Sequence, residues 1–298
     1  MSRASRGAAV LGAMLSLSLL SACGASAAPA PPTITTSSQA TPGDHTVTLT
    51  VGGRTRSLIL HVPPSPAVAN RPLILVYHGA DDTAARTIQE TDFEKVADQT
   101  GEVVAFMQGY ADTWNEGAGH TPAERAGVND VAFTSAAITD LESLVSFDHK
   151  RIVATGFSNG ALMVEDLGCH LGGTISLIVP VEGELPVSVS KTCSPPKALF
   201  VYEIHGTADT AIPYDGGPFS GVGGGTTVLS APASVARWAK LDGCSATPKQ
   251  TTPTKGIGIT KYTKCRRAVS AILRTIDGGS HQWGSNIGEL VTGALPPA

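Results

Sequence analysis

The feature that most constrains this chain is a glycine-flanked serine between a predicted strand and a predicted helix. Residues 156–160 have the sequence Gly-Phe-Ser-Asn-Gly, the apolar run 151–155 precedes them and 161–167 follows. The first run predicts a strand and the second a helix. A serine at such a sharp turn projects its hydroxyl above the sheet, and the glycines let the two arms of the turn pass closely. The pattern therefore predicts a nucleophile at Ser158.

A serine hydroxyl is a weak nucleophile unless a general base activates it, so the chain must also supply a histidine and an acid. In folds built around this turn, the chain order is serine, acid, histidine. The favoured acid is Asp209, and His281 is the one histidine that follows it. His281 lies in a Gly-rich segment after the predicted strand 268–276. We therefore expect His281 to be the general base.

The choice of Asp209 depends on its position directly after the predicted strand 198–204. An acid on such a loop can accept the imidazole N–H and fix its tautomer. Two alternatives stay open. Glu182 follows the predicted strand 175–181, and Asp277 lies four residues before His281.

Two backbone N–H groups are expected to stabilise the negative charge that develops during acyl transfer. One belongs to Asn159, the residue after the nucleophile. The other is expected from the loop after the predicted strand 73–77, where Ala80 is favoured and Gly79 is the neighbouring alternative. His78 precedes Ser158, in the wrong order for the base, so we expect it to shape this loop.

Four motifs in order resemble the secreted poly(3-hydroxybutyrate) depolymerase and feruloyl esterase family: His78-Gly79, residues 156–160, the run from His205 through Asp209 to Pro213-Tyr214, and the run from Asp277 through His281 to Trp283. The resemblance covers residues 45–290. It implies an α/β-hydrolase with a mostly parallel central sheet flanked by helices, acting on carboxylic esters through Ser158, Asp209 and His281. That chemistry needs no cofactor and no metal.

The resemblance implies one of two substrate classes: a polyhydroxyalkanoate-type polyester, or feruloyl and acetyl esters of plant polysaccharide. Members often carry Pro-Gly after the last tryptophan, whereas Gly284 and Ser285 follow it here, which is expected to reshape the substrate rim. Candidate substrate contacts are Trp114, within the long segment 108–129, and Trp283 and Tyr214. The alternative for both indoles is that they only pack the loops.

Strands alternating with helices predict one α/β domain with a mostly parallel sheet. A hairpin is expected at 45–51 and 56–62, followed by strands at 73–77, 103–107, 151–155, 175–181, 198–204 and 268–276, and by helices at 92–99, 130–145, 161–170 and 232–242. Ligands of such a sheet bind at the carboxyl ends of its strands. The catalytic domain is expected to occupy residues 45–298.

Residues 1–22 predict a signal peptide, because Arg3 and Arg6 precede an apolar stretch at 8–20 that is too short to span a membrane. The run from Leu20 to Cys23 resembles a bacterial lipobox, which predicts an exported envelope lipoprotein anchored to the membrane by a lipid on Cys23. The alternative is release to the medium after cleavage near 25–28. Residues 23–44, rich in Ala, Pro, Ser and Thr, are expected to form a flexible tether.

Beyond Cys23 the chain has four cysteines, an even count that indicates disulfides in an exported protein. Three pairings are possible, and the sequential one is favoured: Cys169 with Cys193 and Cys244 with Cys265. A zinc site is disfavoured because no two cysteines have C-x-x-C spacing.

The formal net charge is −4 and the basic residues form no patch or stripe, so no nucleic-acid partner is expected. A monomer that acts on an ester substrate is the favoured prediction. Two other functions stay open: a peptidase or amidase with the same triad, and a catalytically silent, lipid-anchored binding protein. The three catalytic residue types, present in the required order, favour an enzyme.

Overall fold

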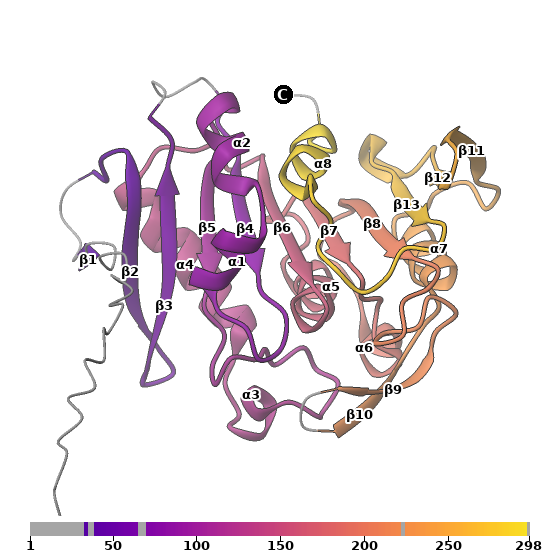
Figure 1. Cartoon of the computed structure of the whole chain (residues 1–298), viewed down its shortest axis with the longest axis horizontal. Coiled ribbons are helices and arrows are strands. Elements are labelled where there is room, and N and C mark those ends of the chain that lie inside the picture. Colours follow the sequence, from indigo (N-terminus) through magenta and orange to yellow (C-terminus); the bar gives the residue numbers. More distant parts are fainter. Residues whose placement is uncertain (1–32, 35–38, 65–69, 222–223, 297–298) are drawn as a thin grey trace, which may run out of the picture. The chain divides into compact units, whose positions relative to one another are not determined.

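The computed structural model describes residues 33–34, 39–64, 70–221 and 224–296. Its strands are β1 (Thr33–Ile34), β2 (Gly43–Val51), β3 (Arg54–Val62), β4 (Leu73–Tyr77), β5 (Val103–Met107), β6 (Ile152–Phe157), β7 (Leu177–Val181), β8 (Phe200–Gly206), β9 (Gly217–Gly221), β10 (Gly224–Val228), β11 (Lys249–Thr254), β12 (Ile257–Tyr262) and β13 (Ala271–Ile276). Eleven of them form one sheet in the order β1-β2-β3-β5-β4-β6-β7-β8-β13-β12-β11 (Figure 1), and β9 and β10 form a separate hairpin.

The centre of the sheet is parallel. Neighbouring strands from β5 through β4, β6, β7 and β8 to β13 all run in one direction. Antiparallel pairs extend the sheet on both sides, β2 with β3 and β3 with β5 on one, and β13 with β12 and β12 with β11 on the other. The carboxyl ends of the parallel strands therefore meet at one edge, where α/β sheets bind ligands.

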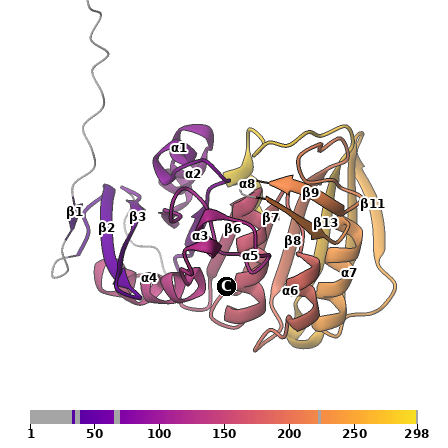
Figure 2. The ribbon, with the colours of Figure 1, turned by 90° about the horizontal axis from the view of Figure 1, so that it is seen from below.

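Helices cover both faces of this sheet (Figure 2). On one face lie α1 (Ala84–Glu90), α2 (Phe93–Thr100) and α8 (Ile287–Gly293), and on the other α4 (Asp130–Leu144), α5 (Asn159–Leu171), α6 (Val187–Thr192) and α7 (Ala231–Leu241). A short helix, α3 (Pro122–Arg125), lies in the long segment after β5. The arrangement confirms the expected α/β-hydrolase fold, with a mostly parallel sheet between two helical layers.

Each face of the sheet has its own apolar core. In β4, Leu73, Leu75 and Tyr77 pack toward α4 and α5, whereas Ile74 and Val76 pack toward α1 and α2. Successive side chains of a strand point to opposite faces, so a strand buried on both sides is apolar throughout. This explains why the central strands were predicted from short uninterrupted apolar runs.

The structure differs from the sequence-based prediction in its smaller elements. The last strand begins at Ala271 and not at residue 268, because Arg266–Ala268 form a 3₁₀ turn. The segment 108–129 contains α3, which starts with a capping box between Thr121 and Glu124. Neither of the hairpins β9–β10 and β11–β12 was predicted, nor was α1 or α8.

Two disulfides are present, and they are the pairs favoured by the sequence. Cys169, near the end of α5, bonds to Cys193 at the end of α6, and Cys244 bonds to Cys265 across the β11–β12 hairpin. The first bond ties the helix that carries the proposed nucleophile to the segment before β8.

The predicted signal peptide and Cys23 lie outside the described residues, as does most of the predicted tether. Among the described residues, none of the helices has the length and apolar character needed to cross a bilayer.

Candidate active site

Ser158 lies at the turn between β6 and α5. Its backbone has φ 55° and ψ −120°, a conformation that residues with a side chain rarely adopt and that costs about 1–3 kcal/mol. The Ser158 N–H donates to the carbonyl of Val181 on β7, at 3.0 Å, and its own carbonyl accepts from Ala161 and Leu162 in the first turn of α5. The sheet and the helix together hold the strained turn that the sequence predicted.

The glycines of the motif are required by close backbone contacts. A Cβ on Gly156 would lie 2.3 Å from the carbonyl oxygen of Gly160, and a Cβ on Gly160 would lie 2.2 Å from that of Tyr77. Real Cβ atoms do not approach so closely, and neither partner is a flexible side chain. Glycine at these two positions therefore lets α5 leave the sheet directly beneath the loop that follows β4.

His281 and Asp209 meet at the carboxyl ends of β8 and β13, which are parallel neighbours. His281 Nδ1 lies 2.7 Å from Asp209 Oδ2. Their loops are joined by the Ala208 N–H, which donates to the carbonyl of Gly279 at 2.9 Å. Gly206 packs directly on Gly279, where a Cβ would lie 2.3 Å from a backbone oxygen. The contact between imidazole and carboxylate is therefore set by backbone packing on both sides.

The Asp209 carboxylate is buried and well supplied with donors. Oδ1 accepts from the N–H groups of Ala211 and Ile212, at 2.7 and 3.0 Å, and Oδ2 also lies 3.3 Å from His205 Nε2. Burial alone would raise the pKa of Asp209, but the contacts with His205 and His281 and the backbone N–H outweigh it and hold the pKa below its ordinary value. Asp209 is thus a carboxylate that stays ionised beside the imidazole.

The two alternative acids lie elsewhere. Glu182 accepts twice from the N–H of Gly206, at 3.0 and 3.1 Å, and burial, then the neighbouring Asp209, raises its pKa to about 8. Asp277 lies near the hydroxyl of Thr207, at 3.5 Å. Of the three acids considered, Asp209 is the one in hydrogen-bond contact with His281.

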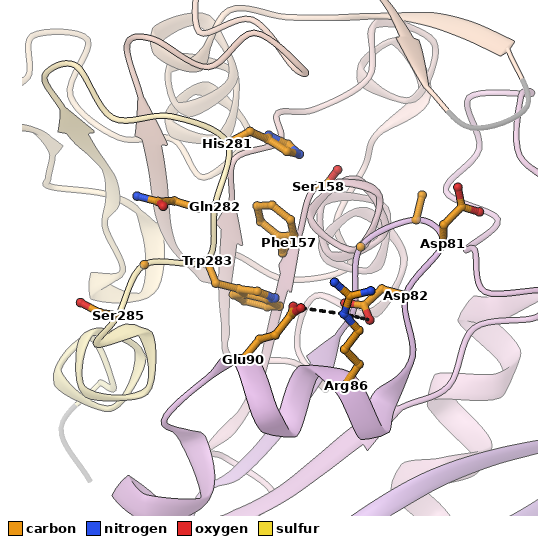
Figure 3. Close-up of a pocket in the computed structure, with 13 residues that line it drawn as sticks. Asp81, Asp82, Arg86, Glu90, Phe157, Ser158, His281, Gln282, Trp283 and Ser285 are labelled. Carbon is orange, nitrogen blue, oxygen red and sulfur yellow. Dashed lines mark hydrogen bonds and ion pairs between the residues drawn. The ribbon is translucent and has the colours of Figure 1, made fainter. Parts of the chain in front are cut away.

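A cavity of about 700 Å³ opens beside Ser158 and His281. Figure 3 shows the Ser158 hydroxyl and the His281 imidazole directed toward one another at its edge. No hydrogen bond joins these two described side chains, and such contacts often tighten only when substrate is bound. The other lining residues are Gly79, Ala80, Asp81, Asp82, Arg86, Glu90, Phe157, Gln282, Trp283, Gly284 and Ser285.

Phe157 organises the wall of this cavity. Its ring lies 4.6 Å from the His281 ring and 5.4 Å from that of Trp283, centroid to centroid. Trp283 is in turn packed edge-on against Phe93 of α2 and is 7% exposed. Phe157 was not among the predicted site residues. Its position directly before the serine could have indicated that it lies at the site.

A second, smaller cavity of about 210 Å³ is also lined by Ser158. Ser158 and Ala80 line both cavities, so the hydroxyl stands where they meet. The smaller cavity is lined further by His120, Thr121, Asn159, Leu162, Ala211, Ile212, Phe219, Ser220 and Gly221. Phe219 and its neighbours come from the β9–β10 hairpin, which is rich in glycine and carries no clear strand signal in the sequence.

The loop after β4 places Gly79 and Ala80 against the serine. A Cβ on Gly79 would lie 3.6 Å from Ser158 Cβ. His78 is fully buried; its Nδ1 lies 2.6 Å from the Gly79 carbonyl, and its Nε2 accepts from the N–H of Gly109 at 2.9 Å. Burial lowers the pKa of His78, so it is a neutral imidazole that holds this loop in shape.

The three predicted substrate contacts lie in different surroundings. Trp114 is 0% exposed, and its indole N–H donates to the His78 carbonyl at 2.9 Å. It packs on Tyr77 beneath the loop, so it cannot reach a substrate. Tyr214 lies against His205, with its hydroxyl 2.9 Å from that of Thr275, and lines neither cavity. Trp283 lines the larger cavity.

Several His and carboxylate side chains in the described part of the chain gather closely enough to hold a metal ion. One group surrounds His61 at the surface, a second contains Glu116, His120 and Glu124 beside the smaller cavity, and two share the buried His205. None of these groups includes Ser158 or His281. At Ser158 itself the structure brings together a hydroxyl on a strained backbone turn, an imidazole and a buried carboxylate.

Comparison with known proteins places the chain among esterases. A sequence profile of the phospholipase/carboxylesterase family matches residues 64–219, more than half of the chain. The chain is 33% identical over 220 residues to feruloyl esterase B of Piromyces equi, a match that covers 72% of this chain and 40% of that protein. It is 28% identical over 156 residues to a bifunctional acetylxylan esterase/xylanase of Neocallimastix patriciarum, covering 52% of this chain and 22% of that protein.

The chain thus spans less than half of the length of these relatives. Among solved structures, an acetyl xylan esterase from Aspergillus awamori matches with a TM-score of 0.52 at 13% identity, over 76% of this chain and 89% of that chain. That likeness shows a shared fold. The match to feruloyl esterase B supports the feruloyl esterase part of the predicted resemblance. The family profile shows that the chain belongs to the phospholipase/carboxylesterase family of α/β-hydrolases.

Proposed function

We propose that this protein is a serine carboxylester hydrolase that acts through an acyl-enzyme formed on Ser158. The observation that carries the proposal is the 2.7 Å contact between His281 Nδ1 and Asp209 Oδ2 at the edge of the cavity that Ser158 lines. With Nδ1 donating to the carboxylate, Nε2 keeps the lone pair that a general base needs.

In the proposed reaction, Ser158 Oγ attacks the ester carbonyl while His281 Nε2 takes the hydroxyl proton. The resulting imidazolium is stabilised by the ionised Asp209. His281 then gives the proton to the departing alcohol, and Ser158 keeps the acyl group. A water molecule, activated by the same imidazole, attacks the acyl-enzyme, which releases the acid and restores the hydroxyl.

The negative charge of each tetrahedral intermediate is proposed to be stabilised by backbone N–H groups of Asn159 and Ala80, with Gly79 as the alternative to Ala80. Asn159 begins α5, so its N–H lies at the positive end of a helix. The side-chain oxygen of Asn159 also accepts from the backbone N–H of Trp114 at 2.9 Å, which links the start of α5 to the segment that contains Trp114. Donors fixed in this way do not need to reorganise during the reaction.

The two cavities that share Ser158 suit the two halves of an ester. The smaller has apolar walls from Leu162, Ile212 and Phe219, and we assign the acyl group to it. The larger has charged groups on its rim, where Arg86 donates to Glu90 at 2.7 Å, and we assign the alcohol part to it. The similarity to a feruloyl esterase and an acetylxylan esterase favours feruloyl or acetyl esters of plant polysaccharide over a polyhydroxyalkanoate polyester.

A fluorophosphonate probe tests the reaction, since it labels only an activated serine. We expect labelling of the wild type at Ser158, none in Ser158→Ala, and a loss of kcat on the order of 10⁶ in that variant toward 4-nitrophenyl acetate. Retention of more than about a tenth of the activity in a folded Ser158→Ala would show another nucleophile at work. A wild type that neither reacts with the probe nor hydrolyses any ester would support the silent binding protein.

The substrate class is tested with methyl ferulate, acetylated xylan and polyhydroxybutyrate film, assayed side by side. We expect turnover of at least one of the two plant-type esters and none of the film. Phe219→Ala is expected to lower kcat/KM for methyl ferulate by roughly threefold to tenfold, the value of one lost aromatic contact, and to leave that for 4-nitrophenyl acetate unchanged. Equal loss on both esters would place the acyl group elsewhere.

We also propose that the protein is exported, and held at the membrane by a lipid on Cys23. Two disulfides in a chain of this size favour an oxidising compartment. The anchor itself is a prediction of the sequence alone.

A further inference from the structure

A buried histidine is surrounded by carboxylates beneath the Asp209 loop. His205 is 0% exposed, and its Nδ1 lies 3.1 Å from Glu184 Oε1. Glu203, two residues earlier on β8, is also fully buried, and one ligand atom from each of the three residues lies within 4.8 Å of the others. None of these side chains takes part in the proposed reaction at Ser158.

The positions of Glu203 and His205 are unusual for such residues. Alternate residues of β8 share one face, and Leu199 and Val201 on this face belong to the apolar core under α5 and α7. A glutamate and a histidine therefore continue an otherwise apolar row. Within the described chain, no lysine or arginine forms an ion pair with Glu184 or Glu203. Buried carboxylates of this kind need a cation or a proton to offset their charge.

The hydrogen bonds of His205 fix its tautomer. Nε2 lies 3.0 Å from the carbonyl oxygen of Ile212, and a carbonyl can only accept, so Nε2 carries the proton. Nδ1 of the neutral ring is then a lone pair aimed at Glu184 Oε1. Two acceptors do not face one another at 3.1 Å unless something positive lies between them.

A proton on Nδ1 would satisfy only part of the cluster. Both oxygens of Glu184 and both of Glu203 are buried without a hydrogen-bond donor, and His205 Nδ1 makes no hydrogen bond either. The one nearby hydroxyl, that of Ser234, is shared, because it contacts Glu203 and also lies 3.4 Å from Glu165 Oε1. Of these four oxygens, an imidazolium pairs with Glu184 Oε1 alone. A single divalent cation bound by all three side chains would take one unpartnered atom from each of them and would offset the charge of both carboxylates.

We propose that Glu184, Glu203 and His205 bind one divalent transition-metal cation of the Zn²⁺ type. An imidazole nitrogen with carboxylate oxygens suits Zn²⁺ better than Ca²⁺ or Mg²⁺, which prefer oxygen alone. Ligands about 2.1 Å from a tetrahedral metal lie roughly 3.4 Å apart, close to the separation of Nδ1 and Oε1. A metal-bound histidine usually donates its other N–H to a carbonyl or carboxylate, as His205 does to Ile212.

The ion would also fix the position of His205, whose Nε2 lies 3.3 Å from Asp209 Oδ2. Its role is structural, because none of the three ligands lines either of the two cavities that contain Ser158. A substrate in those cavities would therefore not reach the ion. Binding is therefore expected to be linked to folding rather than to substrate.

The test measures metal and stability, and it does not depend on esterase activity. The tag-free, disulfide-intact protein is analysed for metals by mass spectrometry, then unfolded with a chelator and refolded with Zn²⁺, with Ca²⁺ or with neither. We expect about one transition-metal equivalent per chain as purified. Refolding without metal should lower Tm, and Zn²⁺ but not Ca²⁺ should restore it. Glu184→Gln and Glu203→Gln should lose the metal even where they fold.

Matched controls come from the other His–carboxylate groups. Glu94→Gln, beside His61, and Glu116→Gln, beside His120, should keep the metal stoichiometry of the wild type. A folded protein with less than about a fifth of an equivalent, whose Tm is the same after refolding in chelator, would overturn the proposal in favour of carboxyl groups held by protons. Metal that survives both ligand variants, or that Glu116→Gln removes, would also overturn it.

Discussion

Asp209 Oδ2 and His281 Nδ1 lie 2.7 Å apart, although 72 positions separate the two residues along the chain. The parallel pairing of β8 with β13 brings them together, and the close contact of Gly206 with Gly279 sets their loops at a fixed distance. The carboxylate is fixed independently by the N–H groups of Ala211 and Ile212. The pair is therefore preorganised by the backbone, and a change in its chemistry can be tested without a change in fold.

Asp209→Asn is expected to lower kcat by roughly 10⁴, because the amide would present the imidazole in the wrong tautomer. The matched variants are Glu182→Gln and Asp277→Asn, which should cost far less, since neither side chain contacts His281. All three are assayed on one activated ester, with thermal melts to exclude unfolding. If Glu182→Gln or Asp277→Asn were the most damaged while Asp209→Asn kept its activity, the assignment of the acid would be wrong.

Gly160→Ala is expected to abolish the folded enzyme, because the new Cβ would lie 2.2 Å from the carbonyl oxygen of Tyr77 and neither backbone can yield. Gly293→Ala is the control. Gly293 is exposed in α8 with no atom within 4 Å of an added Cβ, so alanine there should stabilise by about 0.5–1 kcal/mol. Soluble yield and Tm are compared. A Gly160→Ala variant with wild-type Tm and activity would contradict the packing described for the turn.

Removal of each disulfide by paired alanine substitution should cost about 3 kcal/mol, the value for closing a loop of this length. The two losses are expected to differ in their effect on catalysis. Cys169–Cys193 lies in the core against α5, so its loss should lower kcat as well as Tm, whereas loss of the half-buried Cys244–Cys265 should lower Tm alone. Denaturant unfolding measures the loss of stability in each variant, and steady-state kinetics measure the loss of kcat. Equal kcat in both variants would contradict the expected difference in their effect on catalysis.

Asp242 should make stability depend on pH. Burial raises its pKa to about 7, against an ordinary value of 3.8, with the backbone of Leu199 and the Arg266 guanidinium opposing the shift. The folded state holds a proton that the unfolded chain releases, so this stabilisation is complete below pH 3.8 and is lost as pH rises to about 7. The free energy of unfolding should fall by up to about 1.4 kcal/mol per pH unit in that window.

Asp242→Asn checks this directly, because the neutral amide cannot titrate. The difference in unfolding free energy between wild type and variant, measured with denaturant at about pH 4.5, 6 and 8, should move in favour of the variant as pH rises. Parallel profiles would show that Asp242 is ionised in the folded protein throughout.

Cys23→Ala is expected to convert a membrane-associated protein into a soluble or unprocessed one. Diacylation supplies two acyl chains, which suffice for stable anchoring where one does not. Fractionation of cells that express each form gives the answer. Native protein found in the medium, with a free N-terminus at Gly24 or beyond, would show ordinary secretion.

The sequence was sufficient for features that depend on neighbouring residues or on chain order. The central strands were found because a strand buried on both faces is an unbroken apolar run, as in 73–77 and 103–107. The serine turn was found because its close backbone contacts require glycines at fixed offsets. His281 was selected because one histidine alone follows Asp209. Short elements were missed because an exposed strand needs no apolar pattern. For example, β11 is polar, exposed along its length, and contains Pro253.

Tertiary structure decided what depends on contacts between distant segments. The sequence favoured Asp209 but left Glu182 and Asp277 open; the pairing of β8 with β13 brings Asp209, and neither of the other two, into hydrogen-bond contact with His281. Trp114 is of a residue type that often contacts substrate, yet the fold buries it under the loop after β4. The carboxylates around His205 come from two segments, Glu184 after β7 and Glu203 on β8, and meet only when β7 and β8 pair. The sequence gives the residue types and their order. The distances between side chains depend on packing between segments that lie far apart in the chain.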